Sequence, residues 1–256
     1  MIDYSLADGV AEIVLNDPAK LNALDEAALR ELSGAYTRAA GDRARAVVLR
    51  GEGRAFCAGR DISHASPESD DVLGSLGGLV TPLLKQMSEF PAPTFAVATG
   101  ACLGVGLGLL VATDVVYVAD NARIGSPFAN LGATLDSGGH ALFYERLGAH
   151  RTLDLIYTAE LMTGAEAVAL GLFSRVVPEA DVLEFTRERA RRAAAGAIQA
   201  FLASKELVRQ LRDDRIGLWA SIADENRLQA QLCATPDYRE GFAAFQQKRK
   251  PVFKTP

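Results

Sequence analysis

The 256-residue sequence has few residues that bind metals or form disulfides: it contains three cysteines and three histidines. The cysteines, Cys57, Cys102 and Cys233, are odd in number and widely spaced, without a CxxC pair or histidines at ligand spacing. This pattern indicates neither a disulfide framework nor a zinc site, and we expect no metal. It is typical of a reducing compartment, so we expect a cytoplasmic location.

Positive charge is also not in excess, because 27 lysines and arginines face 32 aspartates and glutamates, which gives a net charge of −5. We therefore expect no nucleic-acid partner. The segment Lys248-Arg249-Lys250 is the local exception, and such charges either meet a phosphate or serve solubility. No proline- or serine-rich linker divides the chain, and its N-terminus lacks the basic-then-apolar layout of an export signal.

Charge is missing altogether between Glu89 and Asp114, a stretch that includes the apolar run Thr94 to Thr113. Its length would allow a membrane-spanning helix. Two prolines precede the run, however, and four glycines interrupt its second half: Gly100, Gly104, Gly106 and Gly108. We therefore favour a buried strand, turn and helix, and expect no membrane partner. A dinucleotide fingerprint is excluded because its third glycine position is Leu109.

Strand and helix patterns alternate along the first part of the chain, and helices alone follow. Strands are expected at Val10 to Leu15, Ala46 to Leu49, Thr94 to Ala98, Asp114 to Val118, Arg123 to Ile124 and Leu172 to Val177. Helices are expected over Asp25 to Ala40, through Leu79, Leu83 and Met87, over Val105 to Ala112, through Leu147, over Arg151 to Thr158, over Gly164 to Leu170 and beyond Val182. This order predicts an α/β fold with a layered, parallel sheet and a helical C-terminal part.

Two turns rich in glycine and other small residues lie where an expected strand leads into a helix. They are Ala55 to Ile62 and Gly100 to Gly106. In such turns the backbone can approach a ligand closely, and the free N–H groups of a helix start favour negative charge. Two amides that converge from different turns would form an oxyanion hole. The alternative is that these glycines only permit tight turns.

Several segments, in order along the chain, resemble the enoyl-CoA hydratase/isomerase (crotonase) family. They are Phe56 to Ile62, Ala101 to Asp114, Ser126-Pro127, Leu131-Gly132 through Gly138-Gly139, and Glu240-Gly241-Phe242 to Lys248-Arg249-Lys250. The resemblance covers nearly the whole chain, from Leu15-Asn16 to Phe253. It implies a crotonase-type (ClpP-like) spiral of β-β-α units, with a core domain over residues 1–195 and a helical trimerisation and active-site cover region over 196–256. It also implies a homotrimer or a dimer of trimers.

The resemblance further implies an acyl-CoA thioester substrate and no cofactor beyond the coenzyme A of that substrate. On the matching positions, the backbone N–H groups of Arg60 and Val105 would hold the thioester oxygen. The backbone of Ala58 would lie near the adenine, and Lys248 would help to bind the nucleotide end. The loop from Ser63 to Asp71 is expected to form part of the acyl pocket wall.

The departures from the family pattern bear on the reaction. Hydratases of the family use two glutamates to activate water, and the matching positions here are Gly108 and Phe128, which transfer no proton. Asp136 matches the acidic position of isomerase members. One carboxylate is sufficient to shift a double bond when two amides hold the enolate, because it takes a proton from C2 and returns it at C4. We therefore expect an enoyl-CoA isomerase with Asp136 as acid/base, in an apolar setting made by Phe128, Leu131 and Leu135.

Other interpretations of Asp136 stay open. It would cap a helix that begins at Ser137, or act as a nucleophile, as the same position does in aryl-CoA dehalogenase relatives. Hydratase activity through another acid, or a non-catalytic acyl-CoA-binding protein, are further alternatives.

The remaining candidate groups have blander explanations. Asp61 would cap or pair with Arg60, His140 would assist proton transfer, and His64 and His150 fall in a polar loop and a turn. Cys57 and Cys102 lie beside the two turns and are expected to pack there as small residues.

Overall fold

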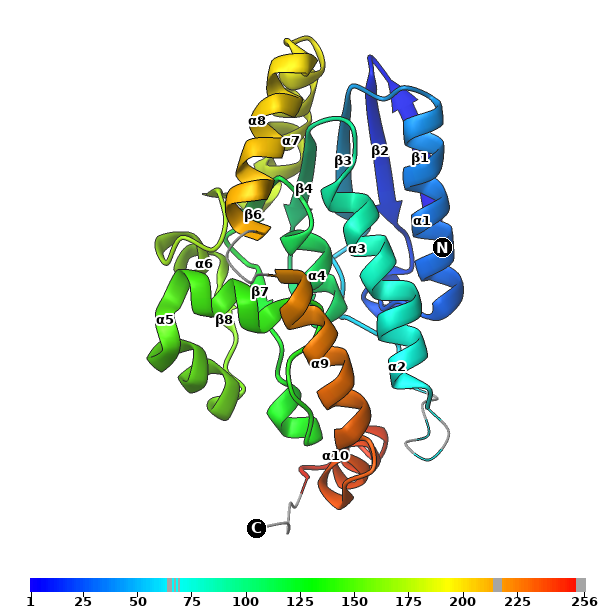
Figure 1. The fold of residues 1–256 in the computed structure, drawn as a ribbon, viewed down its shortest axis with the longest axis vertical. Coiled ribbons are helices and arrows are strands. Elements are labelled where there is room, and N and C mark those ends of the chain that lie inside the picture. Colours follow the sequence, from blue (N-terminus) through cyan, green and yellow to red (C-terminus); the bar gives the residue numbers. More distant parts are fainter. Residues whose placement is uncertain (64–65, 67, 69, 214–217, 252–256) are drawn as a thin grey trace.

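The computed structural model describes residues 1–63, 66, 68, 70–213 and 218–251 (Figure 1). Within these residues, six strands form the main sheet in the order β1-β2-β3-β4-β6-β9. They are β1 (Ile2–Ala7), β2 (Val10–Leu15), β3 (Ala46–Gly51), β4 (Thr94–Ala98), β6 (Val115–Ala119) and β9 (Arg175–Val177). Strand β1 is antiparallel to β2, and every other neighbouring pair is parallel.

Helices cover both faces of this sheet, which explains why all five residues of β4 are buried. One face packs its apolar side chains against α1 (Glu26–Gly41) and α3 (Thr81–Ser88) in the larger core. The other face packs against α7 (Glu179–Ala194), where Phe95 of β4 and Tyr117 of β6 meet Val182. The predicted parallel, layered sheet is confirmed.

A second sheet of three short strands lies in the order β5-β7-β8. Its strands are β5 (Ala101–Leu103), β7 (Arg123–Gly125) and β8 (Met162–Thr163). The chain enters β5 directly from β4 through Gly100, whose φ of +49° is left-handed. The charge-free run thus becomes β4, β5 and α4 (Val105–Val111). None of the described helices combines the length and apolarity that a membrane crossing requires.

The sequence placed most of these elements and missed others. The bounds of β2 and β4 are as predicted, and Asp25 is the N-cap of α1, where it accepts a hydrogen bond from the Ala28 amide. The expected strand, helix and strand between Val10 and Leu49 are present as β2, α1 and β3, and the sequence missed β1, which forms a hairpin with β2 before α1. The two helices expected through Leu147 and over Arg151 to Thr158 form one element, α5 (Gly139–Thr158), with a kink at Gly148 (φ +72°).

The remaining helices are α2 (Val72–Ser75), the π-helical turn η2 (Leu76–Val80), α6 (Gly164–Ala169), α8 (Ile198–Asp213), α9 (Leu218–Leu232) and α10 (Pro236–Gln246), with 3-10 turns η1 (Pro18–Lys20) and η3 (Phe128–Leu131). Figure 1 shows α9 and α10 extending from the core toward the C-terminal end of the chain. Helix α9 packs on α2 and α5, and α10 packs on η3. The division of the chain at residue 195 stays a prediction.

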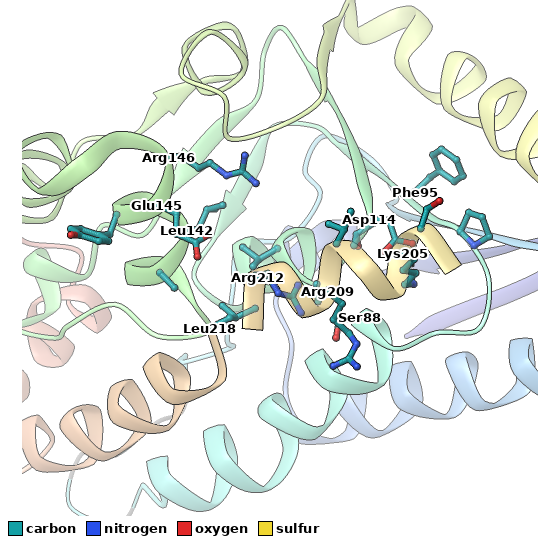
Figure 2. Close-up of a pocket in the computed structure, with 18 of the residues that line it drawn as sticks. Ser88, Phe95, Asp114, Leu142, Glu145, Arg146, Lys205, Arg209, Arg212 and Leu218 are labelled. Carbon is teal, nitrogen blue, oxygen red and sulfur yellow. Dashed lines mark hydrogen bonds and ion pairs between the residues drawn. The ribbon is translucent and has the colours of Figure 1, made fainter. Parts of the chain in front are cut away.

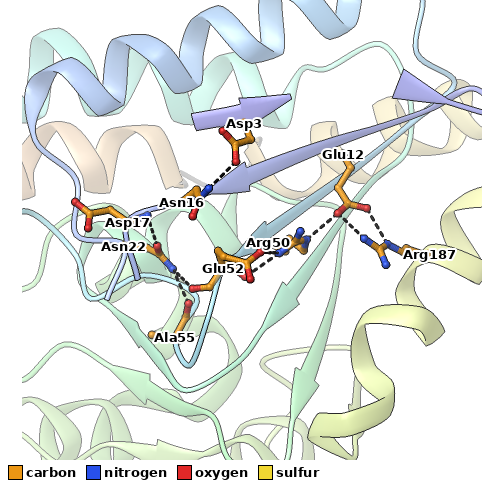
Figure 3. A network of polar contacts seen from close by, with 10 residues as sticks. Asp3, Glu12, Asn16, Asp17, Asn22, Arg50, Glu52, Ala55 and Arg187 are labelled. Carbon is orange, nitrogen blue, oxygen red and sulfur yellow. Dashed lines mark hydrogen bonds and ion pairs between the residues drawn. The ribbon is translucent and has the colours of Figure 1, made fainter. Parts of the chain in front are cut away.

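An ion-pair network joins the sheet to α7 (Figure 3). Glu12 of β2 accepts hydrogen bonds from Arg50 of β3 at 2.7 Å and from Arg187 of α7 at 2.7 and 2.8 Å. Burial alone would raise the pKa of Glu12, but the hydrogen bonds from both guanidinium groups outweigh it and lower the pKa. This network therefore stabilises the sheet on the side of α7 when Glu12 is ionised.

Candidate active site

The first predicted turn, Cys57 to Arg60, is held by backbone hydrogen bonds on two sides. Cys57 pairs with β5 through the amide of Leu103 and the carbonyl of Ala101, at 3.0 and 2.9 Å. The amides of Ala58 and Asp61 donate to the carbonyls of Leu21 and Leu24, both at 2.9 Å. The amide of Arg60 lies between these bonded groups. Within the part of the chain that the structure describes, it has no hydrogen-bond partner.

The second turn ends at the first residue of α4. The amide of Gly104 donates to the Gly125 carbonyl at 3.3 Å and to Ser126 Oγ at 3.2 Å. The next amide, of Val105, begins α4 and has no partner among the described residues. The amides of a first helical turn have no acceptor within the helix, so this N–H is available to a ligand. Each turn thus leaves one backbone donor unused.

The two turns face each other across Gly59 and Gly104. A methyl group built on Gly59 (φ +99°) would lie 3.0 Å from the Leu103 carbonyl oxygen and 3.8 Å from Gly104 Cα. One built on Gly104 (φ +52°) would lie 3.9 Å from Gly59 Cα. Both glycines are required by their left-handed backbone and by this close approach. The free amides of Arg60 and Val105 directly follow these two glycines, so they lie on neighbouring stretches of backbone, and their role as an oxyanion hole stays a prediction. We call these two turns the amide cradle.

Asn22 supports the cradle from behind, and sequence reasoning missed it. Its side chain is fully buried; it donates to the carbonyls of Glu52 and Ala55 at 3.0 and 2.8 Å and accepts from the Asp17 amide at 2.8 Å (Figure 3). These bonds fix the loop whose residues Leu21 and Leu24 hold the first turn. Asn22 has a φ of +57°, a backbone conformation that asparagine adopts more readily than most residues. This φ value can be read only from the structure, so the sequence alone does not indicate the role of Asn22.

Gly108 and Phe128, which the family resemblance matches to the hydratase glutamates, both lie close to the cradle. A methyl group on Gly104 would meet the ring of Phe128 at 3.0 Å, so that ring packs against the cradle. Gly108 lies one turn after Val105 on α4, and a methyl group there would lie 2.5 Å from Ser137 Cβ. The space beside α4 is thus taken by the residue that follows Asp136.

Asp136 is buried, with 7% of its surface exposed, in the turn that precedes α5. Leu135, 2% exposed, is part of the core and Phe128 packs against that core; the apolar setting of Asp136 made by Phe128, Leu131 and Leu135 stays a prediction. Asp136 is not the N-cap of α5, because that helix begins at Gly139 with Gly138 as its cap; the helix expected from Ser137 starts later. The charge of Asp136 acts on Arg60 and contributes to raising the pKa of that guanidinium.

The ion pairs around the first turn differ from those expected. Arg60 pairs with Asp70 rather than Asp61; its Nη1 lies 2.7 Å from Asp70 Oδ2. Hydrogen bonds to Asp70 raise the pKa of Arg60 in spite of its burial. Asp61 instead accepts from Lys20 at 2.7 Å and from Ser63. Burial opposes its ionisation, but these hydrogen bonds outweigh burial and lower its pKa to about 2, so Asp61 is a permanent anion and a poor proton carrier.

The sequence predicts that Ala58 and Lys248 both contact coenzyme A. In the described part of the chain, no hydrogen bond or ion pair links these two residues. The Ala58 amide donates to the Leu21 carbonyl at 2.9 Å. Lys248 is exposed just after α10, with φ of +53°. Its neighbour Arg249 pairs with Glu240 on α10 at 2.8 Å. A role of either residue in binding stays a prediction, and the loop from Ser63 to Asp71 lies partly outside the described residues.

The described cysteines beside the turns are buried thiols, and a role of His140 in proton transfer stays a prediction. His140 Nε2 lies 3.3 Å from Thr134 Oγ1, His150 is exposed on α5 rather than in a turn, and His64 lies outside the described residues. Burial raises the pKa of Cys57 to about 12 and that of Cys102 well above its usual value, so both thiols stay protonated at neutral pH. Among the described residues, no cluster of three or more metal-ligating side chains occurs.

A cavity of about 1550 Å³ lies elsewhere, between α8, α5 and the residues that follow α4 (Figure 2). Lys205 of α8 lines it and pairs with Asp114 at 3.0 Å. The cavity includes none of Arg60, Val105 or Asp136. It is therefore not the space in front of the amide cradle.

The comparisons with known proteins agree with this geometry. The family model described as enoyl-CoA hydratase/isomerase matches residues 5–256. This chain belongs to the enoyl-CoA hydratase/isomerase family. It is an acyl-CoA-processing enzyme of the crotonase type, and its fold is the crotonase fold. The predicted family and fold class are confirmed.

Relatives match along the full length of the chain. A protein of Rhodobacter capsulatus named "probable enoyl-CoA hydratase" is 36% identical over 252 residues, which cover 98% of this chain and 97% of that protein. The 2,3-dehydroadipyl-CoA hydratase of Escherichia coli is 33% identical and covers 94% of each chain. A crystal structure of an enoyl-CoA hydratase from Mycobacterium avium subsp. paratuberculosis superposes with a TM-score of 0.87, at 28% identity and 99% and 98% coverage.

Another similar structure is a methylmalonyl-CoA decarboxylase in complex with 2-nitronate-propionyl-CoA, with a TM-score of 0.85, 25% identity and 99% and 98% coverage. Proteins named as hydratases and as a decarboxylase thus share this fold. The reaction of an individual member therefore has to be argued from its own side chains.

Proposed function

We propose that this enzyme moves a double bond in enoyl-CoA thioesters, from the 3- to the 2-position. The observation that carries the proposal is the buried acid: Asp136 is 7% exposed and its charge acts on Arg60, while the two positions that the family resemblance matches to the hydratase glutamates are Gly108 and Phe128.

The proposed mechanism needs one carboxylate and two amides. The N–H groups of Arg60 and Val105 donate to the thioester oxygen and stabilise the negative charge that develops there as C2 loses a proton. Asp136 takes that proton and returns it at C4, so the double bond shifts while atoms and charge balance. Asp136 is 7% exposed, so the proton it carries is kept from exchange with bulk water, and this supports its role as proton carrier.

Hydration is the second candidate, because the curated relatives reported above carry hydratase names. In that reaction an acid or base must activate a water molecule at C3. The ring of Phe128 packs at Gly104 and Ser137 packs at Gly108, and neither Gly108 nor Phe128 carries a carboxylate that could activate water. This arrangement favours proton transfer within the substrate over addition of water.

Purified enzyme should be incubated separately with 3-enoyl-CoA, 2-enoyl-CoA and 3-hydroxyacyl-CoA, and the products followed by chromatography. Conversion of 3-enoyl-CoA to 2-enoyl-CoA without hydroxyacyl-CoA is the expected result. Interconversion of 2-enoyl-CoA and 3-hydroxyacyl-CoA as the faster reaction would replace the proposal with a hydratase. Binding without turnover would indicate a non-catalytic member, and an acyl or aryl adduct on Asp136 in mass spectrometry would indicate a nucleophile.

We also propose that the chain assembles as a homotrimer. Large apolar side chains are exposed on α5 and α8, including Tyr144 (64%), Tyr157 (73%), Leu207 (61%) and Val208 (66%). Exposed apolar surface of this kind marks an interaction site. Light scattering is expected to give the mass of three chains, and Val208→Glu to lower it. A wild-type mass of one chain would contradict the trimer. A cytoplasmic location stays a prediction.

A further inference from the structure

We propose that Gly108 is a specificity-determining position: the absence of a side chain there lets the turn Asp136-Ser137-Gly138 pack on α4 and so positions Asp136. This inference rests on the proposed role of Asp136. It means that any side chain at position 108 would displace Asp136 from its present position.

The contact between Gly108 and Ser137 is tight and involves atoms that cannot rotate away. A methyl group on Gly108 would lie 2.5 Å from Ser137 Cβ and 2.9 Å from the Ser137 carbonyl oxygen. The Cβ and the carbonyl are fixed by the backbone of Ser137, so relief requires the turn itself to move. Because Asp136 is the preceding residue in that turn, it would move as well.

The turn is held in place on its other sides. Ser137 has a left-handed φ of +53° and is 2% exposed, and a non-glycine residue keeps such a conformation only where its surroundings impose it. A methyl group on Gly138 (φ +90°) would lie 2.7 Å from a methyl carbon of Leu218. The Gly139 amide donates to the Asp136 carbonyl at 3.0 Å. The turn is therefore confined between α4 and α9.

Ser137 offers a way to relieve the contact without losing a polar interaction. Its hydroxyl is buried and has no hydrogen-bond partner within the described chain. Replacement of Ser137 by glycine removes the Cβ that faces Gly108 and suits the left-handed backbone. The structure therefore supplies a rescue variant together with the disruptive one.

The test compares Gly108→Ala, Ser137→Gly and the double variant in the isomerisation of 3-enoyl-CoA. We expect Gly108→Ala to lower kcat about 10²-fold, as displacement of a catalytic group by about 1 Å does, with KM and the binding of saturated acyl-CoA nearly unchanged. Ser137→Gly is expected to retain activity, and the double variant to recover part of the lost kcat, because the contact at 2.5 Å with the Ser137 Cβ is removed and the one at 2.9 Å with the carbonyl oxygen remains. Gly34→Ala on α1 is the matched control, because a methyl group there meets nothing within 4 Å.

Crystal structures of the wild type and Gly108→Ala separate this inference from the proposed function. A displaced Asp136 with unmoved amides of Arg60 and Val105 is expected, whether or not the wild type isomerises 3-enoyl-CoA. An unmoved Asp136, or full activity of Gly108→Ala, would overturn the inference. Failure of the double variant to recover kcat, or loss of acyl-CoA binding with Gly108→Ala, would show that α4 itself is disturbed and would also overturn it. Absence of isomerisation by the wild type alone would overturn only the proposed function.

Discussion

The amide cradle and the turn that carries Asp136 are neighbours, but they are held in place by different kinds of contact. The cradle is made of backbone N–H groups fixed by the ladder between Cys57 and β5 and by the loop at Leu21 and Leu24. The acid is one side chain on a turn that depends on packing against Gly108. Under the proposed function, we expect the first arrangement to suit any acyl-CoA thioester and the second to select the reaction. Family members can therefore share the cradle and differ in chemistry.

Asp136→Asn tests the acid alone and should have the largest effect. We expect kcat for 3-enoyl-CoA to fall about 10²–10⁴-fold, because asparagine of the same shape cannot carry the proton. Binding of a saturated acyl-CoA, measured by calorimetry, should change little because the cradle is intact. A parallel loss of binding would remove the distinction between the two regions.

Gly59→Ala tests the cradle alone. Gly59 has a φ of +99°, and a methyl group there would lie 3.0 Å from the Leu103 carbonyl oxygen. The alanine side chain would therefore force the two turns apart. We expect kcat/KM to fall about 10²–10³-fold, as for removal of an oxyanion donor, and acyl-CoA binding to weaken as well. Steady-state kinetics and calorimetry check both. Gly78→Ala, where a methyl group meets nothing within 4 Å, should leave both unchanged.

Asn22→Ala tests the support behind the cradle. The substitution leaves the buried carbonyl of Ala55 without its donor and the Asp17 amide without its acceptor, so the free energy of unfolding should fall by about 2–3 kcal/mol. Urea denaturation measures this. Asn16→Ala is the matched control: Asn16 is exposed and donates to Asp3, and a change near zero is expected. Equal losses in the two variants would contradict the assigned role.

Glu12→Gln changes a residue outside both the cradle and the Asp136 turn. Of the four variants, it should have the smallest effect. The pKa of Glu12 is lowered in the folded state, so its contribution is present above the usual value of 4.5 and is lost as pH falls through the folded pKa. We expect about 1 kcal/mol of destabilisation at pH 7 that disappears at low pH, measured by denaturation across pH. A pH-independent difference would contradict this origin, and kcat should not change.

The sequence predicted the long, strongly patterned elements well. Strand β4 has the predicted bounds because its buried apolar residues stand between prolines and glycines. The sequence missed β1, whose residues are mostly exposed and include an acid, and it missed β5 and β8 of the second sheet, which are too short to show a period; the predicted strand Arg123 to Ile124 is present as β7. The partners of Arg60 and Asp61 were wrong because Asp70 and Lys20 reach them only through the folded chain.

In the candidate site, too, the sequence predicted some features and missed others. Glycines at turns and the family pattern indicated the amides of Arg60 and Val105, and the structure leaves both without a partner in its described part. The sequence also indicated Asp136 and the departures at Gly108 and Phe128. It did not show that Ser137 fills the space beside Gly108, because a contact between a helix and a distant turn leaves no local pattern.

The most direct test of a cradle served by one acid is to follow a labelled proton. With 3-enoyl-CoA deuterated at C2, the account predicts that the wild type forms 2-enoyl-CoA with deuterium at C4, because buried Asp136 carries it there, and that Asp136→Asn binds the substrate without forming product. Turnover by Asp136→Asn at the wild-type rate would contradict the account.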